Sequence, residues 1–541
     1  MRLPARFPAV LAIILLAGLA AAQEPSVVLT KPQEALIRQA VWGEMAERTA
    51  ALEALRKLPS TKERVRRVEE IIRAGRTYPA IQEAKQTFTV PIDGDRKLTV
   101  HVQLPKDYDP AQRYPLMAAM GGGPTPDEKR AKAQGAMMYA VWSKPALEAS
   151  WLVAAIEDTV SILKTTKPLR YPMLTDDHFR AVRDELFRRY ALDPDRVHAT
   201  GISLGSNYAT VYAAAHPDWF AGIAPVSTEG ESREHVVRNL RHVGVFVLEG
   251  AKDKNIRTIE GPRTQAKILD ALGYRHRYEE DPDRAHEGFM PKYPAVLRWL
   301  AEQPRVPFPK QVVRLAHPGI VPPARRFYWL EADTHQACVE AIVKGNTIDI
   351  HAARARRLTL HLSDRLLDLD QPVLVNVNGQ KVHEGRVERS LLTAVEDAAS
   401  LNDSERFAVA RLSVPVPDLE AGERWLKTLD ARIAPARLPF WEDFAALTMQ
   451  EARPKLTEKL EQEKGPLPDA PGRTALRVLE APDASPLRRD DRILEYDGEP
   501  FFTDTDGLAF LHSYLWRTRG TTLRLKVLRA GQAQEIVLPL K

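Results

Sequence analysis

The central part of the chain, from about residue 86 to residue 302, alternates short apolar runs with stretches whose apolar residues recur at helical spacing. Strands are predicted at 197–200, 220–225 and 243–248. Helices are predicted at 176–190 and over the small residues 207–215, which end at a His-Pro pair. This alternation predicts an α/β domain in which helices flank a sheet.

The segments around this domain have other patterns. Residues 23–85 include a stretch rich in Ala, Leu, Glu and Arg with apolar residues three and four positions apart, which predicts a helical cap or hairpin. Prolines gathered between residues 305 and 323 mark 303–323 as a linker. A Glu- and Lys-rich stretch at 441–464 predicts a helical connector over 433–470.

Residues 324–432 change to a period of two, with Asn378-Gly379 as a hairpin turn, and therefore predict a β-rich module. Short strands at these intervals suggest a β-sandwich of about a hundred residues. The predicted strands are 326–330, 347–350, 358–362, 372–377 and 381–383.

One short motif carries chemical information. Gly201-Ile-Ser-Leu-Gly205 lies between a predicted strand and a predicted helix. A serine hydroxyl is inert at neutral pH, and one route to reactivity places it at the tip of a tight strand-to-helix turn, where a histidine can reach its proton. In such a turn a Cβ two residues before or after the serine would collide, and Gly201 and Gly205 avoid this. Ser203 is therefore a candidate nucleophile, with a purely structural turn as the alternative.

Here the sequence resembles the α/β-hydrolase family, in particular its secreted esterase and depolymerase-like members. The resemblance is carried by Gly-Ile-Ser-Leu-Gly-Ser and by Ala-Ala-Ala-His-Pro-Asp-Trp-Phe shortly after it. It covers about residues 86–302 and implies an α/β-hydrolase core sheet with flanking helices. The family carries its catalytic residues in the order serine, acid, histidine.

The resemblance implies the other two catalytic residues on loops that follow later strands. Asp253 comes after the strand 243–248 and His286 after a strand at 275–278. In these roles His286 takes the proton of Ser203, and Asp253 fixes the imidazole tautomer and stabilises its charged form. Two other histidines, His242 and His276, are less suitable because they lie before or within strands. Three other carboxylates lie close enough in sequence to replace the acid: Glu249, Asp281 and Asp283.

Acyl transfer also needs N–H donors directed at the oxyanion of the intermediate. The resemblance implies the backbone N–H of Leu204 as one donor, and a glycine-rich loop as the source of the second. Met120-Gly-Gly-Gly123 has that form, and we expect Gly122 and Gly123 to contribute. Met120 stands where the family commonly has histidine, which leaves the choice among these two glycines and Gly121 open.

Residues 471–541 resemble a PDZ domain of the bacterial type. The similarity is carried by the run from Ser485-Pro486 to Gly498 and by a predicted helix at 508–515. It implies a peptide or protein ligand bound along a sheet edge. The run departs from the family pattern because Asp490 stands where glycine is usual, and no glycine-rich carboxylate loop is recognisable near 473–476.

Residues 1–22 have the pattern of an export signal, with a basic start, an apolar run at 9–22 and small residues before Gln23. The run is shorter than the roughly 20 residues that span a bilayer. We therefore expect a periplasmic or extracellular protein without a membrane anchor. The sole cysteine, Cys338, excludes an intrachain disulfide.

The charge is close to balance, with 77 basic and 72 acidic side chains. This balance, without a strongly basic domain, argues against a nucleic-acid partner. The 14 histidines form no pair with metal-ligand spacing, since His335 and Cys338 lack a second half-site. We expect neither a metal nor another cofactor.

These features predict an exported serine hydrolase that cleaves a small-molecule or polymer-borne carboxylic ester through an acyl-enzyme. The preference for an ester comes from the resemblance to secreted esterases. Two alternatives remain open: a serine peptidase of the prolyl-oligopeptidase type, and a binding scaffold whose hydrolase domain is inactive.

Overall fold

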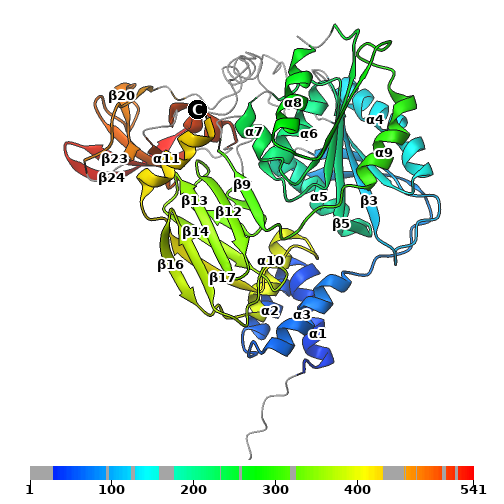
Figure 1. Ribbon diagram of the computed structural model, residues 1–541, viewed down its shortest axis with the longest axis horizontal. Coiled ribbons are helices and arrows are strands. Elements are labelled where there is room, and N and C mark those ends of the chain that lie inside the picture. Colours follow the sequence, from blue (N-terminus) through cyan, green and yellow to red (C-terminus); the bar gives the residue numbers. More distant parts are fainter. Residues whose placement is uncertain are drawn as a thin grey trace, which may run out of the picture.

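The structure is a computed structural model, and the residues it describes are 28–92, 97–122, 128–157, 176–231, 233–254, 259–316, 324–430, 456, 458–468, 470, 472–502, 507–517 and 522–540. Figure 1 shows the domain predicted at residues 86–302, which we call the hydrolase-like domain. The two sheets of the β-rich module lie beside this domain, and a C-terminal unit, which begins at β18 (Lys459–Gln462), lies beyond them. The predicted export signal 1–22 lies outside the described residues.

An eight-stranded sheet forms the centre of the domain predicted at 86–302. Its order is β1-β2-β4-β3-β5-β6-β7-β8. β1 pairs with β2, and β2 with β4, in antiparallel fashion, whereas all other neighbours are parallel. The sheet fits the α/β-hydrolase core expected from the resemblance. Its strands are β1 (Lys85–Pro91), β2 (Lys97–Gln103), β3 (Tyr114–Met120), β4 (Leu152–Ile156), β5 (Leu192–Ile202), β6 (Gly222–Val226), β7 (Gly244–Gly250) and β8 (His276–Asp281).

Helices cover both faces of this sheet, because its inner strands are apolar on both sides. Met117 and Ala119 of β3 share a core with α4 and α9, whereas Leu116 and Ala118 share one with α5 and α6. Figure 1 shows the two helix layers flanking the strands. The helical segments are α4 (Glu128–Glu148), α5 (Asp176–Arg189), α6 (Leu204–Ala215), α7 (Glu234–Arg238), α8 (Glu260–Ala271), the 3-10 turn η1 (Met290–Lys292) and α9 (Tyr293–Ala301).

The β-rich module consists of two sheets that share one hydrophobic core. One sheet has the order β10-β11-β14-β17 and the other β16-β15-β13-β12-β9. The predicted hairpin turn is present, with φ of 51° at Asn378 and 79° at Gly379. The predicted strand 326–330 is instead two short strands, because the chain turns at Tyr328, where φ is 49°. The elements are β9 (Gln311–Arg314), β10 (Arg326–Phe327), β11 (Leu330–Ala332), β12 (Cys338–Lys344), β13 (Thr347–Ala353), β14 (Arg357–Leu362), β15 (Val373–Val377), β16 (Gln380–Gly385), α10 (Leu391–Leu401), β17 (Ala410–Pro415) and α11 (Leu419–Asp430).

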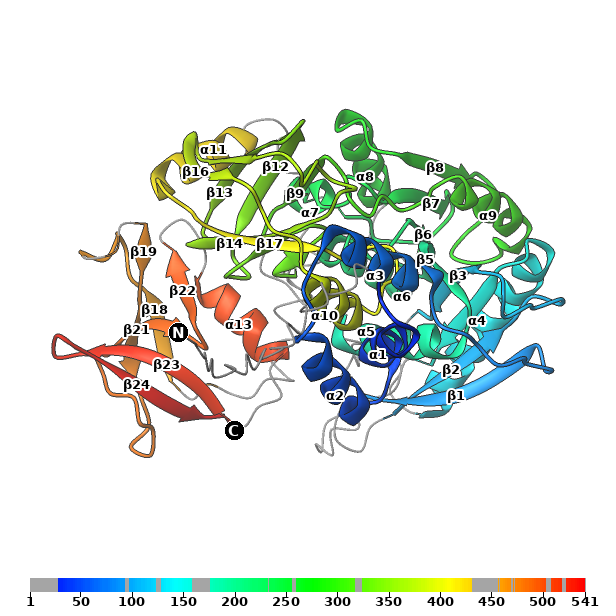
Figure 2. The same cartoon turned by 90° about the horizontal axis from the view of Figure 1, so that it is seen from below.

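The N-terminal segment is helical as predicted, with α1 (Lys31–Trp42), α2 (Met45–Leu55) and α3 (Lys62–Ala74). The helices α1 and α2 are joined by two residues and pack against each other, but they do not form a unit separate from the rest of the chain. Ile37 and Val68 are fully buried in the same hydrophobic core as Val395 of α10. Figure 2 shows α1 and α3 beside α10. An amphipathic helix must bury its apolar side, but its sequence does not specify against which surface.

The predicted linker 303–323 is wrong over residues 303–316. Gln311–Arg314 forms strand β9, which pairs with β12 of the second sheet. Arg305 is buried and forms ion pairs with Asp195 and Asp403. Prolines thus lie between tightly packed elements here, and residues 317–323 lie outside the described residues.

The C-terminal unit contains a seven-stranded sheet and the helix α13 (Gly507–Arg517). The predicted connector helix is wrong at residues 459–462, which form β18 and pair with β20. Most of the remaining connector, 433–455, lies outside the described residues. Buried Glu499 accepts hydrogen bonds from the backbone N–H of His335 and pairs with Arg325, so the unit contacts the β-rich module. The strands are β18 (Lys459–Gln462), β19 (Arg473–Thr474), β20 (Leu476–Glu480), β21 (Arg492–Tyr496), β22 (Glu499–Phe502), β23 (Thr522–Arg529) and β24 (Gln532–Pro539).

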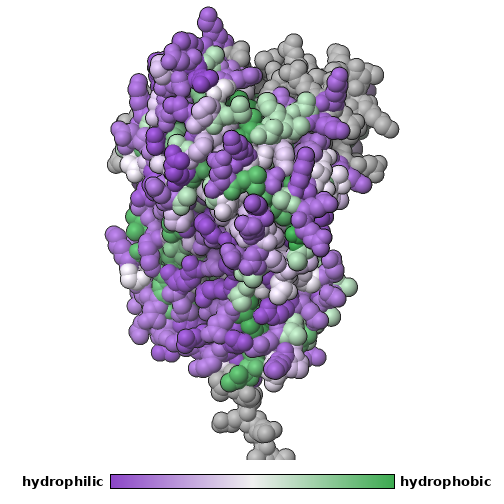
Figure 3. All heavy atoms as spheres, turned by 90° about the vertical axis from the view of Figure 1, so that its right-hand side faces the viewer, coloured by the Kyte–Doolittle hydropathy of each residue, from purple (hydrophilic) through white to green (hydrophobic). Residues whose placement is uncertain are grey.

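Hydrophilic side chains predominate on the face of the molecule that Figure 3 shows, and hydrophobic ones are scattered among them. Within the described ranges, no helix combines the length and the hydropathy that a membrane span requires.

Candidate active site

Ser203 lies at the tip of a sharp turn between β5 and α6, as the glycine motif predicted. Its φ is 56° and its ψ is −122°, a conformation that non-glycine residues avoid. Such backbone strain costs about 1–3 kcal/mol and persists only where the surroundings enforce it. Here the backbone N–H of Ser203 donates to the carbonyl of Val226, at the end of the neighbouring strand β6, at 3.0 Å.

The two glycines of the motif are required by close backbone contacts. A Cβ on Gly201 would lie 2.1 Å from the carbonyl carbon of Gly205. A Cβ on Gly205 would lie 2.3 Å from the carbonyl oxygen of Met120, at the end of β3. Both distances are far below van der Waals contact. The turn can therefore form only with glycine at these positions.

Asp253 and His286 are in direct contact. The carboxylate Oδ2 of Asp253 lies 2.7 Å from Nδ1 of His286. Asp253 follows β7 and its side chain is fully buried, whereas His286 follows β8 and keeps 16 % of its side chain exposed. A carboxylate at Nδ1 favours the tautomer with the proton on that nitrogen, which leaves Nε2 able to accept a proton.

The loops that carry Ser203 and His286 are joined through consecutive residues at the end of β6. Val226 accepts the backbone N–H of Ser203, and the hydroxyl of Ser227 donates to the carbonyl of His286 at 2.9 Å. The strands β5 to β8 are parallel, so the residues that follow them lie along one edge of the sheet. The predicted residues Ser203, Asp253 and His286 thus all follow strands at this edge, and two of them, Asp253 and His286, are in direct contact.

The other carboxylates considered for the acid have different surroundings. Glu249 is fully buried, and burial raises its pKa well above the usual range, while Thr228 donates its backbone N–H to it at 2.8 Å. Asp281 accepts the backbone N–H of Asp283, and Asp283 pairs with Lys252 on the surface. Within the described part of the chain, Asp253 is the one of the four that contacts His286.

The two other histidines considered for the base contact backbone carbonyls. Nδ1 of His276 lies 3.0 Å from the carbonyl of Tyr274, and Nε2 of His242 lies 2.6 Å from that of Gln311. His242 is therefore directed at the β-rich module rather than at the edge of the sheet that carries Ser203.

The glycine loop after β3 packs directly on the serine. A Cβ on Gly122 would lie 2.3 Å from the carbonyl oxygen of Ile202 and 2.8 Å from Cβ of Ser203. A Cβ on Gly121 would instead meet Gln134 of α4 at 2.8 Å. Gly122 is therefore the loop residue of these two that adjoins the nucleophile. Gly123 lies outside the described residues.

Leu204 begins α6, so its backbone N–H is among the first groups of the helix, which have no partner within it. An N–H in this position next to Ser203 is available to an anion that forms above the serine.

Ser227, which holds the backbone of the histidine loop, was not predicted from the sequence. Its φ of 48° is a second strained position at the same sheet edge. The signal in the sequence was its place two residues after the predicted strand 220–225. Among the described residues, no group of three or more His, Cys, Asp or Glu side chains has the arrangement of a metal site.

Comparison with known proteins relates parts of this chain to esterases. No protein-family model matches the chain. It is 39 % identical over 97 residues to a protein of Nocardia uniformis subsp. tsuyamanensis named "Putative esterase NocK", a match that covers 18 % of this chain and 28 % of that protein. It is 46 % identical over 44 residues to poly(3-hydroxyalkanoate) depolymerase C of Paucimonas lemoignei, covering 8 % and 11 %. The chain thus spans only a minor part of these relatives.

Solved structures similar to this chain include a thermostable esterase and a ferulic acid esterase. The match to the first has 22 % sequence identity and a TM-score of 0.34, and it covers 41 % of this chain and 64 % of the esterase chain. The match to the second has 15 % sequence identity and a TM-score of 0.30, and it covers 40 % of this chain and 96 % of the ferulic acid esterase chain.

Proposed function

We propose that this chain is a serine hydrolase that cleaves carboxylic esters through an acyl-enzyme. The observation that carries the proposal is the strained backbone of Ser203 between β5 and α6. A turn of this kind has a stability cost, and it serves to expose a nucleophile. The contact of Asp253 with His286 at the same sheet edge supports the assignment, as do the names of the matched relatives.

In the proposed reaction Ser203 attacks the acyl carbonyl while Nε2 of His286 accepts its proton. The backbone N–H groups of Leu204 and Gly122 stabilise the oxyanion, with Gly123 as the other loop candidate. His286 then gives the proton to the leaving alcohol, and water cleaves the acyl-enzyme by the reverse proton path. Buried Asp253 stabilises the imidazolium that forms in both halves of the reaction.

A fluorophosphonate probe tests whether Ser203 is activated. We expect covalent labelling of the wild-type chain and none of Ser203→Ala, whose turnover should fall roughly a million-fold. Ser400→Ala is the matched control, because Ser400 is an exposed serine on α10 that donates to the carbonyl of Asp397. Absence of labelling in the wild type would support the binding-scaffold alternative.

The leaving group distinguishes an esterase from a peptidase. We expect hydrolysis of short p-nitrophenyl esters and none of peptide p-nitroanilides, since the relatives are named for ester substrates. A higher kcat/KM for peptide anilides than for esters would favour the peptidase. Release of acid from a polyester film would then separate a polymer-borne substrate from a small-molecule one.

We also propose that the β-rich module is a β-sandwich and that the C-terminal unit is PDZ-like. In this unit β18 is the end strand of its sheet in the described residues, and α13 lies beside it, where the backbone N–H of Gly507 donates to Gln462. A peptide would pair with the outer edge of β18. Titration with a library of free C-terminal peptides tests this, and a library without any binder argues against it.

We further propose that the chain is exported. Residues 1–22 supply the signal pattern on which this depends. N-terminal sequencing of protein recovered from the periplasm of a bacterial host should begin at Gln23. Full-length protein retained in the cytoplasm would contradict it.

A further inference from the structure

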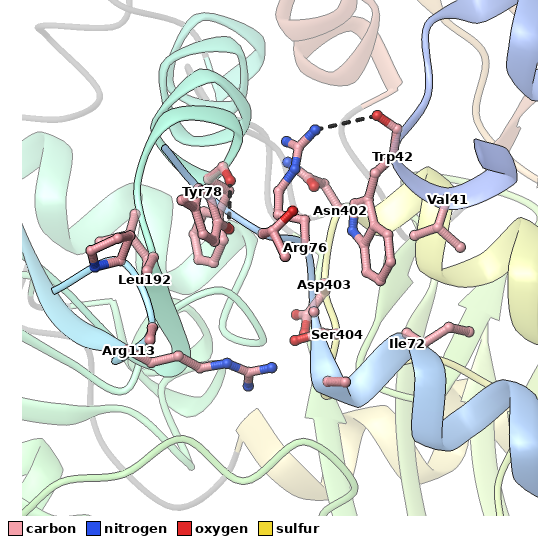
Figure 4. Close-up of a pocket in the computed structure, with 17 residues that line it drawn as sticks. Val41, Trp42, Ile72, Arg76, Tyr78, Arg113, Leu192, Asn402, Asp403 and Ser404 are labelled. Atoms are coloured by element: carbon pink, nitrogen blue, oxygen red, sulfur yellow. Dashed lines mark hydrogen bonds between the residues drawn. The ribbon is translucent and has the colours of Figure 1, made fainter. Parts of the chain in front are cut away.

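A cavity of about 330 Å³ lies where three parts of the molecule meet. Its walls come from the N-terminal helices, from the hydrolase-like domain near Leu192 and from the loop 402–404 of the β-rich module. Figure 4 shows this cavity, with Arg76 between Trp42 and Tyr78. Its volume is at the small end of the range for small-molecule sites.

The cavity is remote from Ser203. Leu192 lies opposite Tyr114 at the start of β3, whereas Gly201, two residues before Ser203, lies opposite Met120 at the end of β3. The seven-residue length of β3 therefore separates the cavity from the serine turn. At about 3.3 Å per residue this separation is roughly 20 Å. A ligand bound here would not touch the proposed catalytic residues.

Arg76 gives the cavity a positive charge, and Glu44 attracts this charge only from beyond hydrogen-bond distance. Its guanidinium donates to the backbone carbonyls of Trp42 at 3.2 Å and Arg188 at 3.4 Å. Among the residues that the structure describes, Arg76 has no carboxylate partner. Partial burial lowers its pKa from the ordinary value of arginine, yet the group stays charged near neutral pH.

The other charged groups of the cavity are already paired. Arg113 donates to Glu405 at 2.9 Å. Asp403 is fully buried and forms an ion pair with Arg305. Among the charged side chains that line the cavity, Arg76 is thus the one left without an ion pair in the described structure. A ligand with a single negative charge would complement it.

The remaining walls are largely apolar and aromatic. Val41, Ile72 and Phe187 are buried, and the ring of Tyr78 is fixed because its hydroxyl donates to the carbonyl of Phe187 at 3.0 Å. In Figure 4 the side chains of Trp42 and Tyr78 flank Arg76 on either side. Such walls suit a flat or aliphatic body, since aromatic side chains offer large apolar contact area.

A larger cleft of about 620 Å³ between α5 and the β10-β11-β14-β17 sheet has more arginines but a different balance. Its arginines face carboxylates: Arg326 binds Asp397 in bidentate fashion, and Arg406 pairs with Asp218. Each of its arginines is paired with at least one carboxylate, and in this the cleft differs from the cavity that Arg76 lines.

We propose that the 330 Å³ cavity binds a monocarboxylate with an apolar or aromatic body. The carboxylate accepts charge-assisted hydrogen bonds from Arg76, and the body packs against Trp42 and Tyr78. The site joins the N-terminal helices to the hydrolase-like domain, so bound ligand also stabilises their contact.

Calorimetric titration of the full chain with benzoate, and with benzamide as its uncharged counterpart, tests the proposal. We expect benzoate to bind at least about tenfold more tightly than benzamide, the gain typical of one charge-assisted contact. Arg76→Gln should abolish this difference, and Arg76→Lys should retain it. Arg66→Gln is the matched control, because it removes an exposed charge of α3 outside the cavity.

Benzoate also resembles the acid product of the proposed reaction, so ester hydrolysis is measured in parallel. Binding at the cavity predicts no competitive inhibition of ester hydrolysis, whereas competitive inhibition with an inhibition constant equal to the dissociation constant of benzoate would place benzoate at Ser203 and overturn the proposal. Equal affinity for benzoate and benzamide, or no binding up to about 10 mM, overturns the proposal.

A second measurement does not depend on the folding of a variant. Photolysis of wild-type protein with an azidobenzoate, followed by peptide mass spectrometry, should place the label near Trp42 or Tyr78. A label found only in other segments overturns the assignment of the cavity.

Discussion

Gly122 and Ser203 lie in such close contact that a Cβ added to Gly122 would be 2.8 Å from Cβ of the serine and 2.3 Å from the carbonyl oxygen of Ile202. The loop after β3 therefore rests against the proposed nucleophile. A side chain here must displace either the loop or the serine turn, and both carry proposed N–H donors for the oxyanion.

Gly122→Ala should lower kcat for a p-nitrophenyl ester at least about 100-fold, the typical loss for one oxyanion donor. Gly385→Ala is the matched control, because the nearest atom to its Cβ would be 3.7 Å away in the side chain of His383. Equal activity of both variants would remove Gly122 from the proposed site.

Asp253→Asn should reduce kcat about 10⁴-fold with little change in stability, because the amide favours the wrong tautomer of His286. Asp283→Asn is the control, since Asp283 lies on the histidine loop but pairs only with exposed Lys252 in the described structure. Steady-state kinetics with a p-nitrophenyl ester, compared with fluorophosphonate labelling rates, measures the effect. A loss below tenfold would show that another group supports His286.

Arg305→Met should destabilise the contact between the hydrolase-like domain and the β-rich module. The guanidinium is almost fully buried between Asp195 and Asp403, and removing it leaves buried Asp403 without its shortest ion pair. Loss of one partner of a buried pair costs about 3–5 kcal/mol.

Urea unfolding of Arg305→Met, followed by tryptophan fluorescence, measures this cost. The control is Arg424→Met, whose side chain is 66 % exposed and has ion-pair distances of 3.7 and 3.8 Å. That change should alter the free energy of unfolding by less than about 1 kcal/mol. Similar midpoints for the two variants would contradict the prediction.

Acid should weaken the β-rich module through Asp397. Burial alone would raise its pKa, but the bidentate hydrogen bonds from Arg326 and other donors outweigh it and lower the pKa to about 2. A carboxyl whose pKa is lower in the folded state stabilises the fold above its unfolded pKa near 4, and this contribution disappears as the pH falls toward 2. The contribution is about 2 kcal/mol.

The free energies of unfolding of wild type and Asp397→Asn, measured across this pH range, test the linkage. The difference between the two proteins should shrink as the pH decreases from about 4. A constant difference would mean that the ionisation of Asp397 does not change on unfolding in this range.

The local chemistry of the candidate site could be predicted from the sequence because its signals are local. Glycines at positions 201 and 205 around Ser203 reflect backbone contacts of less than 3 Å, which few other residues permit. The identity of the catalytic acid was less well determined by the sequence, since four carboxylates lie at comparable positions near the predicted loops. Only the folded loops distinguish Asp253, which contacts His286, from Glu249, which is held by Thr228.

The predictions that were wrong concern which surfaces meet. Residues 303–316 have the composition of a linker, yet Arg305 is buried and β9 joins a sheet whose other strands lie further along the chain. Residues 459–462 continue a polar helical pattern, but pairing with β20 makes them a strand. Long-range hydrogen bonds and ion pairs override local propensity at both places.

The sequence by itself determined the alternation of strands and helices in the central domain, the glycine-flanked serine and the period-two strands of the β-rich module, because periodicity and steric requirements act between near neighbours. The tertiary structure alone decided that the N-terminal helices complete the core of the β-rich module, which acid contacts His286, and that Arg76 faces a cavity without a carboxylate partner in the described residues. These depend on surfaces brought together from distant parts of the chain, and burial and charge balance select among partners that local patterns leave equivalent.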